Sequence, residues 1–258
     1  MLINTVILFL RDALPIFVLL GLLLAQVRLS KTLLSGALLL GFALSLIFIQ
    51  QVDSLGMLFD GAGLEITLWS LHVIFYINVL VLGYVCLGAR SEHLNPVWFA
   101  VGLIVIMFVA KGSNFLLYFN GFFNQLDALQ SMSIGTLLGL GICLSVAILL
   151  FFFMHGLRVR FGRIAPWIVL LVFASGELMN SLHLLVQVDL LHTSAPVWNS
   201  QWLIDDESEY GHLFNVLFGY VSAPTMLQIS VFTAAIVLPL LQYWRVSVLL
   251  SASRGINQ

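Results

Sequence analysis

Four ionisable side chains inside apolar segments are the residues best placed to do chemistry. Arg11 and Asp12 are neighbours in one segment, Lys111 lies in a second and Glu177 in a third. A charged side chain at the centre of a bilayer costs roughly 2.5–3.5 kcal/mol on insertion scales, so each group needs a partner or a purpose. Their formal charges sum to zero, which leaves two interpretations open. Either they form a neutral buried network, or Asp12 and Glu177 handle a cation or protons along an ion pathway.

Helical geometry gives these charges expected partners. Neighbouring side chains on a regular helix point about 100° apart, so we expect Arg11 and Asp12 to find separate partners. The expected cross-helix pair is Asp12 with Lys111. Pro15 cannot donate a backbone hydrogen bond to the carbonyl of residue 11, which leaves either an ordinary kinked helix or a free carbonyl at an ion site. Glu65 lies at the outer end of an apolar segment, where it either recruits a metal ion or serves as an interfacial acid.

The composition predicts that the elements carrying these residues lie in a membrane. The 258-residue chain is 61% hydrophobic and 9% charged, and its mean hydropathy is +1.08. In lipid only helices and closed barrels satisfy the backbone, and the continuous apolar segments favour helices. Segments of about 20 apolar residues predict seven spans, at 3–26, 32–51, 66–88, 96–120, 133–156, 165–187 and 225–244. We therefore expect an all-α membrane protein with a single transmembrane domain over residues 1–258.

The basic residues outside the spans all fall on one side of the membrane. Because cytoplasmic loops are enriched in Lys and Arg, this sorting predicts that the N-terminus is outside and the C-terminus inside. The basic residues are Arg28, Lys31, Arg90, Arg158, Arg160, Arg163, Arg245 and Arg254, and the opposite loops hold Asp53, Asp60, Asp127, Asp205, Asp206, Glu207 and Glu209. The first span lacks the basic start of a signal peptide, so we expect it to be retained. The expected location is the bacterial inner (plasma) membrane, crossed several times.

Two polar interruptions, three spans apart, indicate an internal repeat. They are Arg11–Pro15 in the first span and Ala110–Asn114 in the fourth. Since three is odd, units of about 1–88 and 96–187 would have opposite orientations in the membrane, with both interruptions at about the same depth. Paired interrupted helices in two inverted units are typical of a transporter's midplane site. The seventh helix, at about 225–244, lies outside both units.

The remaining polar and aromatic residues indicate no enzyme. An outer loop at about 188–222 contains Trp198 and Trp202, which either anchor it at the membrane interface or dock an outer partner. His72 and His183 lie inside spans, but no repeated spacing or Cys motif indicates haem. No nucleophile–base pair, phosphate loop or zinc triad is visible. We expect no enzymatic activity, no certain cofactor and no nucleic-acid partner.

The arrangement resembles the Ftr-type high-affinity iron permeases, including bacterial Efe-like members. That family has seven spans, with an Arg-Glu-x-x-Glu motif in the first and the fourth. Here Phe9–Pro15 stands in the place of the first motif and Val109–Phe115 in the place of the second. Other segments are also similar to family signatures: Gly61-x-Gly63-x-Glu65 before the third span, Gly176, His183, Leu184 and Gln187 in the sixth, and Leu217–Pro224 with Leu227-Gln228 before the last.

The motif carboxylates are largely replaced in this chain. The resemblance implies that the motif glutamates coordinate iron, and hard cations need oxygen ligands. The first motif keeps Arg11 with the shorter acid Asp12 and has Pro15 in place of its second acid. The second motif has Lys111 and Asn114 in place of its two acids, with Gly112 between them. These motifs are therefore degenerate, and the candidate metal ligands that remain are Asp12, Glu65 and Glu177.

Three hypotheses follow from these residues and the resemblance. The first is inward transport of an iron ion at a divergent motif site, with iron delivered by a periplasmic iron-binding or oxidase partner. The second is a non-transporting membrane subunit of the same fold, which anchors or organises a redox or transport assembly with other membrane subunits. Its motivation is the replacement of motif carboxylates by Lys111, Asn114 and Pro15. The third is transport of another solute or of protons.

Overall fold

The computed structural model describes residues 2–87, 95–116, 126–192 and 194–255. Seven of its helices are long and apolar enough to cross a membrane, which fits a multi-pass membrane protein. The segments are Thr5–Gln26, Lys31–Gly56, Gly63–Leu87, Pro96–Leu116, Ser133–Phe161, Ile164–Gln187 and Met226–Arg245. All seven predicted spans therefore correspond to helices. Residues 117–120 of the fourth predicted span, Arg90 and the side chains of Asp127 and Arg254 lie outside what is described.

The helices are longer and more interrupted than the predicted spans. The first span contains α1 (Leu2–Leu8), a π-helical turn η1 (Phe9–Ala13) and α2 (Leu14–Gln26), and the fourth contains α5 (Pro96–Met107) and a second π-helical turn η3 (Phe108–Gly112). The other elements are α3 (Lys31–Gly56), a short 3-10 turn η2 (Phe59–Gly61), α4 (Gly63–Leu87), α7 (Leu126–Phe161), α8 (Ile164–Gln187), α9 (Glu209–Phe218) and α10 (Met226–Gly255).

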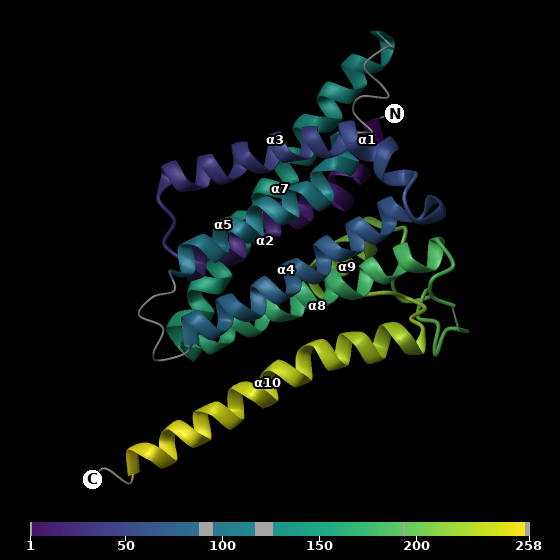
Figure 1. The fold of residues 1–258 in the computed structure, drawn as a ribbon. Helices are drawn as coiled ribbons and strands as arrows, with labels where there is room; N and C mark the ends of the chain where they lie inside the picture. Colours follow the sequence, from purple (N-terminus) through teal and green to yellow (C-terminus); the bar gives the residue numbers. More distant parts are fainter. Residues whose placement is uncertain (1, 88–94, 117–125, 193, 256–258) are drawn as a thin grey trace.

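The first span lies at the centre of the bundle. Leu14, Leu19, Leu22 and Leu23 of α2 are almost completely buried. By contrast α3 and α10 lie at opposite edges of the bundle (Figure 1) and are buried over only 17% and 11% of their spans. Their outward faces carry exposed apolar side chains, as lipid-facing helices do. The charged interruption of the first span is thus held on the most enclosed helix.

Helix pairing follows a regular pattern. In the first pair α2 packs along α7, in the second α3 packs along α5 and η3, and in the third α4 packs along α8. Figure 1 shows α4 and α8 side by side, with α10 beyond α8. α10 makes its main contacts with α8 alone.

Two glycines allow the interrupted helices to approach their neighbours closely. A Cβ added at Gly41 of α3 would lie 2.7 Å from the Cβ of Phe108, and one added at Gly139 of α7 would lie 2.6 Å from the Cβ of Phe9. Both distances are too short for real carbon atoms, so neither position accepts a larger residue without a shift. Small residues at such contacts are typical of helix packing in membranes.

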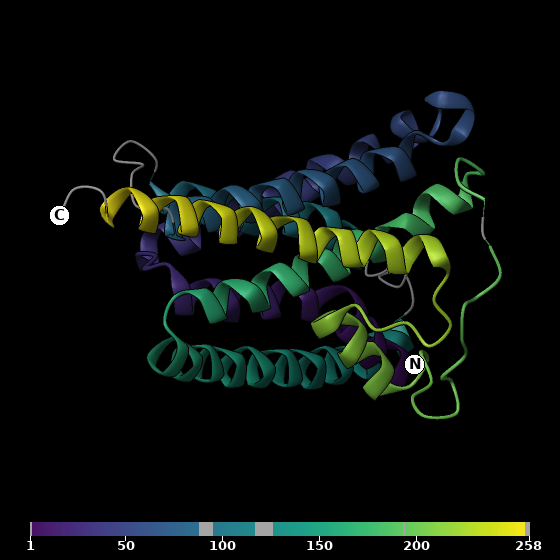
Figure 2. The same ribbon diagram turned by 90° about the horizontal axis from the view of Figure 1, so that it is seen from below.

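The segment between α8 and α10 is ordered by its own hydrogen bonds. The backbone N–H of Val197 donates to the carbonyl of Pro224, and that of Ser200 donates to the carbonyl of Ser222. The Asp206 carboxylate accepts hydrogen bonds from both the backbone N–H and the hydroxyl of Ser222. Figure 2 shows this segment at the bundle end where α1 begins, opposite the end where α10 finishes. The predicted loop at 188–222 therefore contains a short helix, α9, that sequence analysis missed.

Candidate functional site

Both polar interruptions form π-helical turns. Phe9–Ala13 contains Arg11 and Asp12, and Phe108–Gly112 contains Lys111. π-Helical turns are rare in proteins, and those that occur are often found at functional sites. The seven residues of α1 precede the first turn, and helical residues 113–116 follow the second. The two turns contact each other.

Local sequence explains each irregular turn. Pro15 is the second residue after η1, and because its ring would clash with the carbonyl of residue 11 in a regular helix, the wider turn relieves the clash. There the backbone N–H of Leu14 donates to the carbonyl of Phe9, five residues earlier. The second turn ends at the pair Gly112-Ser113, a common place for helix distortion. The Ser113 hydroxyl donates to the carbonyl of Val109.

A neighbouring helix contacts the first carbonyl of each turn. The Ser45 hydroxyl of α3 donates to the carbonyl of Phe108 at 2.9 Å. The Cys143 sulfur of α7 lies 3.8 Å from the carbonyl of Phe9 and donates to it. Because π-helical turns leave backbone groups without their regular partners, these contacts stabilise both turns from outside their own helices.

The two turns border one large polar cavity. Its volume is about 760 Å³, and it is lined by Arg11, Asp12, Leu68, His72, Ala110, Lys111, Asn114, Glu177, Asn180, Ser181, His183, Leu184, Gln187, Asp206, Glu207, His212, Asn215, Val216, Val221 and Gln228. The lining includes residues of five predicted spans, of α9 and of the segments on either side of α9. The cavity therefore connects the segment between α8 and α10 to the charged residues within the spans.

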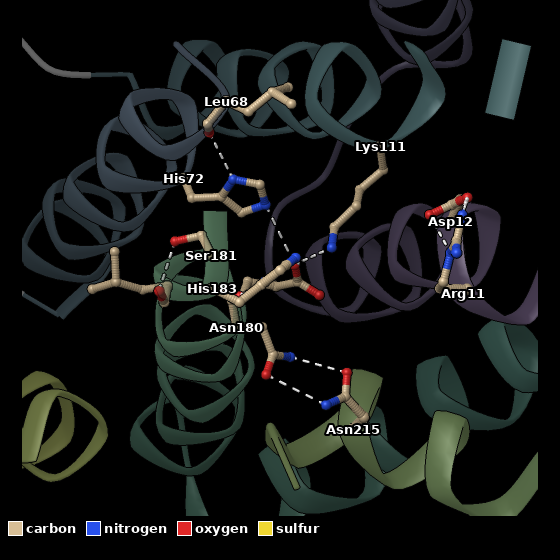
Figure 3. Close-up of polar contacts among 11 residues, drawn as sticks. Arg11, Asp12, Leu68, His72, Lys111, Asn180, Ser181, His183 and Asn215 are labelled. Atoms are coloured by element: carbon tan, nitrogen blue, oxygen red, sulfur yellow. Dashed lines mark hydrogen bonds and ion pairs between the residues drawn. The ribbon is translucent and has the colours of Figure 1, made fainter. Parts of the chain in front are cut away.

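Glu177 is the centre of the most buried charged group in this cavity. Its carboxylate oxygen Oε2 lies 2.8 Å from Nζ of Lys111 and 3.6 Å from Nε2 of His72. The side chains of Glu177, His72 and Lys111 are 2%, 7% and 19% exposed. His72 Nδ1 donates to the carbonyl of Leu68 at 2.8 Å, which fixes the orientation of the ring. Figure 3 shows the side chains of His72 and Lys111 converging from different helices.

The expected pairing of Asp12 with Lys111 is wrong. The ammonium group of Lys111 forms its ion pair with Glu177 on α8. Asp12 is instead paired with its neighbour Arg11: Nε lies 3.2 Å from Oδ1 and Nη2 lies 2.9 Å from Oδ2. We expected these neighbours to point apart, but a π-helical turn has more residues per turn, so successive side chains are closer in angle. The long Arg11 side chain, 62% exposed, reaches back over Asp12, which is 5% exposed.

The three candidate metal ligands do not form one cluster. Asp12 and Glu177 line the cavity, whereas Glu65 does not and lies in the first turn of α4. Across the described ranges, no group of three or more His, Cys, Asp or Glu side chains is placed to hold a metal ion. A cation bound here would need to displace Lys111 from Glu177 or to take ligands from water and from the amide groups of the cavity.

From the sequence, Asn180 is expected to form an interhelical hydrogen bond rather than to bind a ligand, and the structure confirms this. Asn180 of α8 and Asn215 of α9 exchange amide hydrogen bonds at 3.0 and 3.3 Å, which attaches α9 to α8 (Figure 3). Asn215 also donates to the carbonyl of Tyr220. His183 hydrogen-bonds to the carbonyl of Asn180. Sequence analysis did not single out Asn215, whose position depends on α9, the helix that it missed.

The motif positions have distinct surroundings. Pro15 is buried below the first turn, and Asn114 lines the cavity beside Lys111. Gly112 lies against the Phe108 ring and the Ser45 hydroxyl, where an added Cβ would be 3.1 and 3.4 Å away. Pro15 thus shapes the first turn, Asn114 contributes a polar amide to the cavity, and Gly112 allows close packing against α3.

Comparison of the chain with protein-family models, curated proteins and solved structures finds no match. The resemblance to iron permeases therefore depends on the motif residues, and the site must be interpreted from its own geometry.

Proposed function

We propose that this protein is a membrane permease that moves a cation inward through the cavity, and that iron is the cargo the motif resemblance implies. The observation that carries the proposal is the continuous polar cavity itself. It extends from Asp206 and Glu207 in the outer segment to the Lys111–Glu177 pair between the spans. A polar cavity of about 760 Å³ with intramembrane ionisable groups is costly unless a solute or ion uses it.

The proposed inverted repeat would support transport. Three helix pairs match under exchange of the two proposed units, 1–88 and 96–187: the first span packs on the fifth, the fourth packs on the second, and the third packs on the sixth. Gly41 touches Phe108 as Gly139 touches Phe9. Ser45 and Cys143, each four residues further along, bond the carbonyls of the same two phenylalanines. Such units around a midplane site are typical of secondary transporters.

The charge distribution supports import rather than export as the working orientation. The cavity includes acids of the segment at 188–225, whereas Arg28, Arg158 and Arg163 lie near the opposite bundle end. With the positive-inside rule, the cavity would open to the outside of a bacterial inner membrane. Acidic side chains at its mouth would raise the local concentration of cations there. A periplasmic iron-binding or oxidase partner would deliver the ion to this mouth.

Lys111 sets a condition on transport. An incoming cation at 4 Å from the ammonium group would be repelled by about 4 kcal/mol per unit charge at an effective dielectric constant of 20. The Lys111 side chain is flexible and borders the cavity, so it can move away from Glu177 when a cation arrives. In this mechanism Lys111 is a tethered cation that holds the Glu177 carboxylate ready for exchange.

The test is radioactive iron uptake by proteoliposomes that contain the purified protein. Wild-type protein should take up iron, and Asp12→Ala and the double variant Lys111→Met/Glu177→Gln should abolish uptake. The double variant removes both charges together and so avoids an unpaired buried ion. Asp53→Asn is the matched control, because this exposed carboxylate near the end of α3 lies outside the cavity and should leave uptake intact. Uptake that survives the double variant would exclude Glu177 from the pathway.

A second candidate function is favoured by the Lys111–Glu177 pair. A neutral, buried ion pair occupies the place of a cation site, as expected for a non-transporting subunit that organises a redox or transport assembly. Gentle solubilisation followed by pull-down and mass spectrometry would identify stoichiometric membrane partners. Uptake that is absent in the wild type but appears in Lys111→Glu would also favour this candidate, because it would show an intact fold with a disabled site.

A further inference from the structure

Two smaller cavities lie at the bundle end opposite the segment at 188–225. One has a volume of about 270 Å³ and the other about 450 Å³. They share Gln26 at the end of α2 and Arg158 near the end of α7. Neither shares a residue with the large cavity, so this region is separate from the proposed permeation site.

The charged side chains among the described residues that line these two cavities are basic. Arg158 and Arg163 line the smaller one, and Arg28, His155 and Arg158 line the larger one. The described lining residues of both include no Asp or Glu. The remaining walls are mainly apolar. Arginines with no acid among the described residues that line the same cavity, beside an apolar wall between helices, are suited to an anionic headgroup.

Arg158 is held in a fixed position. Its Nη1 donates to the carbonyls of Ala25 and Gln26 at 3.0 and 3.3 Å, which leaves Nε and Nη2 available for another acceptor. Gln26 in turn donates to the carbonyl of Pro166 on α8. The guanidinium group is therefore placed before any ligand arrives. A planar guanidinium can bind phosphate oxygens through two parallel hydrogen bonds.

We propose that Arg158 and Arg163 bind a phosphate group, supplied at the membrane surface by an anionic phospholipid. The headgroup occupies the smaller cavity between the ends of α4 and α7 and the starts of α5 and α8. The acyl chains extend along apolar side chains such as Val85. The site is independent of the cargo of the large cavity.

The chain supplies its own reporter for this site. Cys86 lines the smaller cavity, whereas Cys143, the only other cysteine, is completely buried. We would measure the rate of maleimide labelling of Cys86 in the full-length protein in nanodiscs, with mass spectrometry to locate the label. Replacing phosphatidylcholine stepwise with phosphatidylglycerol should slow labelling. If inorganic phosphate in phosphatidylcholine discs protects Cys86 equally, the phosphate site stands and its source is the free anion.

Two arginines of the α7–α8 connection make a matched pair of variants. Arg163 lines the cavity, while Arg160 lies over the Phe161 ring and does not line it. Each substitution, Arg163→Gln or Arg160→Gln, removes one positive charge, so both change the surface potential similarly. Arg163→Gln should weaken protection by phosphatidylglycerol about five-fold or more, and Arg160→Gln should leave it unchanged. Equal effects of the two variants, or no difference between the two lipids, would overturn the proposal.

Discussion

The Lys111–Glu177 ion pair can be measured by a double-mutant cycle. Removing one partner of a buried ion pair costs about 3–5 kcal/mol, because the other charge stays buried without compensation. Lys111→Met leaves Glu177, only 2% exposed, with the imidazole of His72 at 3.6 Å as its remaining polar neighbour. We therefore expect a loss of about 3 kcal/mol in the free energy of unfolding, at the lower end of that range.

The two single variants should not cost the same. In Glu177→Gln the unpaired group is the ammonium of Lys111, which is 19% exposed and borders the cavity. It can turn toward water, so we expect a smaller loss, about 1–2 kcal/mol. In Lys111→Met/Glu177→Gln neither charge of this pair is left without its partner, and the double variant should be more stable than the sum of the single effects implies. The expected coupling free energy is about 2 kcal/mol.

The assay is equilibrium unfolding by SDS in mixed micelles, followed through tryptophan fluorescence. Lys31→Met is the matched control, because this exposed lysine begins α3 and should change stability by less than about 0.5 kcal/mol. Single effects that add without coupling would refute the pairing. A larger loss for Glu177→Gln than for Lys111→Met would refute the argument from relative burial.

Three further outcomes follow from the packing and the topology. Gly139→Ala should destabilise the protein by about 1–3 kcal/mol in the same SDS assay, because the new methyl group meets a phenylalanine Cβ at 2.6 Å, whereas Gly141→Ala has open space and should not. Asn215→Ala removes its hydrogen bonds to α8 and to the following turn, so limited proteolysis should cut the segment at 188–225 faster. A cysteine at Asn199 should be labelled from outside the cell, and one at Arg160 only after permeabilisation; the reverse pattern would invert the proposed orientation.

The length of the continuous apolar segments was sufficient to predict the seven long helices. Continuous apolar runs of this length have few other solutions, since lipid demands that each backbone group be bonded within its own segment. The positions of the helix ends were harder to predict from the sequence. α7 begins at Leu126 and ends at Phe161, well beyond the predicted 133–156, because polar and basic residues extend a helix into the interface without changing its backbone.

α9 illustrates a signal that was present and overlooked. Ser208 accepts a hydrogen bond from the backbone N–H of Gly211, and Gly219 ends the helix in a left-handed conformation with φ of 70°. A Ser before the first turn and a Gly after the last are the usual marks of a short helix. Gly219 also lies against Gly176 of α8 so closely that a Cβ on either residue would clash. Aromatic residues drew attention to this region as an interface segment, and its caps were not considered.

The partners of the charged residues could not be deduced from spacing. A regular helix places Arg11 and Asp12 on different faces, and only the π-helical turn lets them pair. The choice of Glu177 over Asp12 as the partner of Lys111 depends on the packing of α8 against α4 and of α4 against η3, which no local pattern encodes. The sequence therefore indicates which charged residues are buried, whereas their ion-pair partners depend on the tertiary packing of the helices.

The strength of the Lys111–Glu177 pair separates the two candidate functions. A cation that binds Glu177 must first break this pair, so the coupling free energy is subtracted from its binding free energy. At about 2 kcal/mol the affinity falls roughly 30-fold, which a multivalent ion can offset through its stronger attraction to the carboxylate. At 4 kcal/mol or more the loss approaches 1,000-fold, and the carboxylate is in effect permanently neutralised. A weak pair therefore supports an exchangeable site and transport, whereas a strong one supports a subunit whose buried charges serve only the fold.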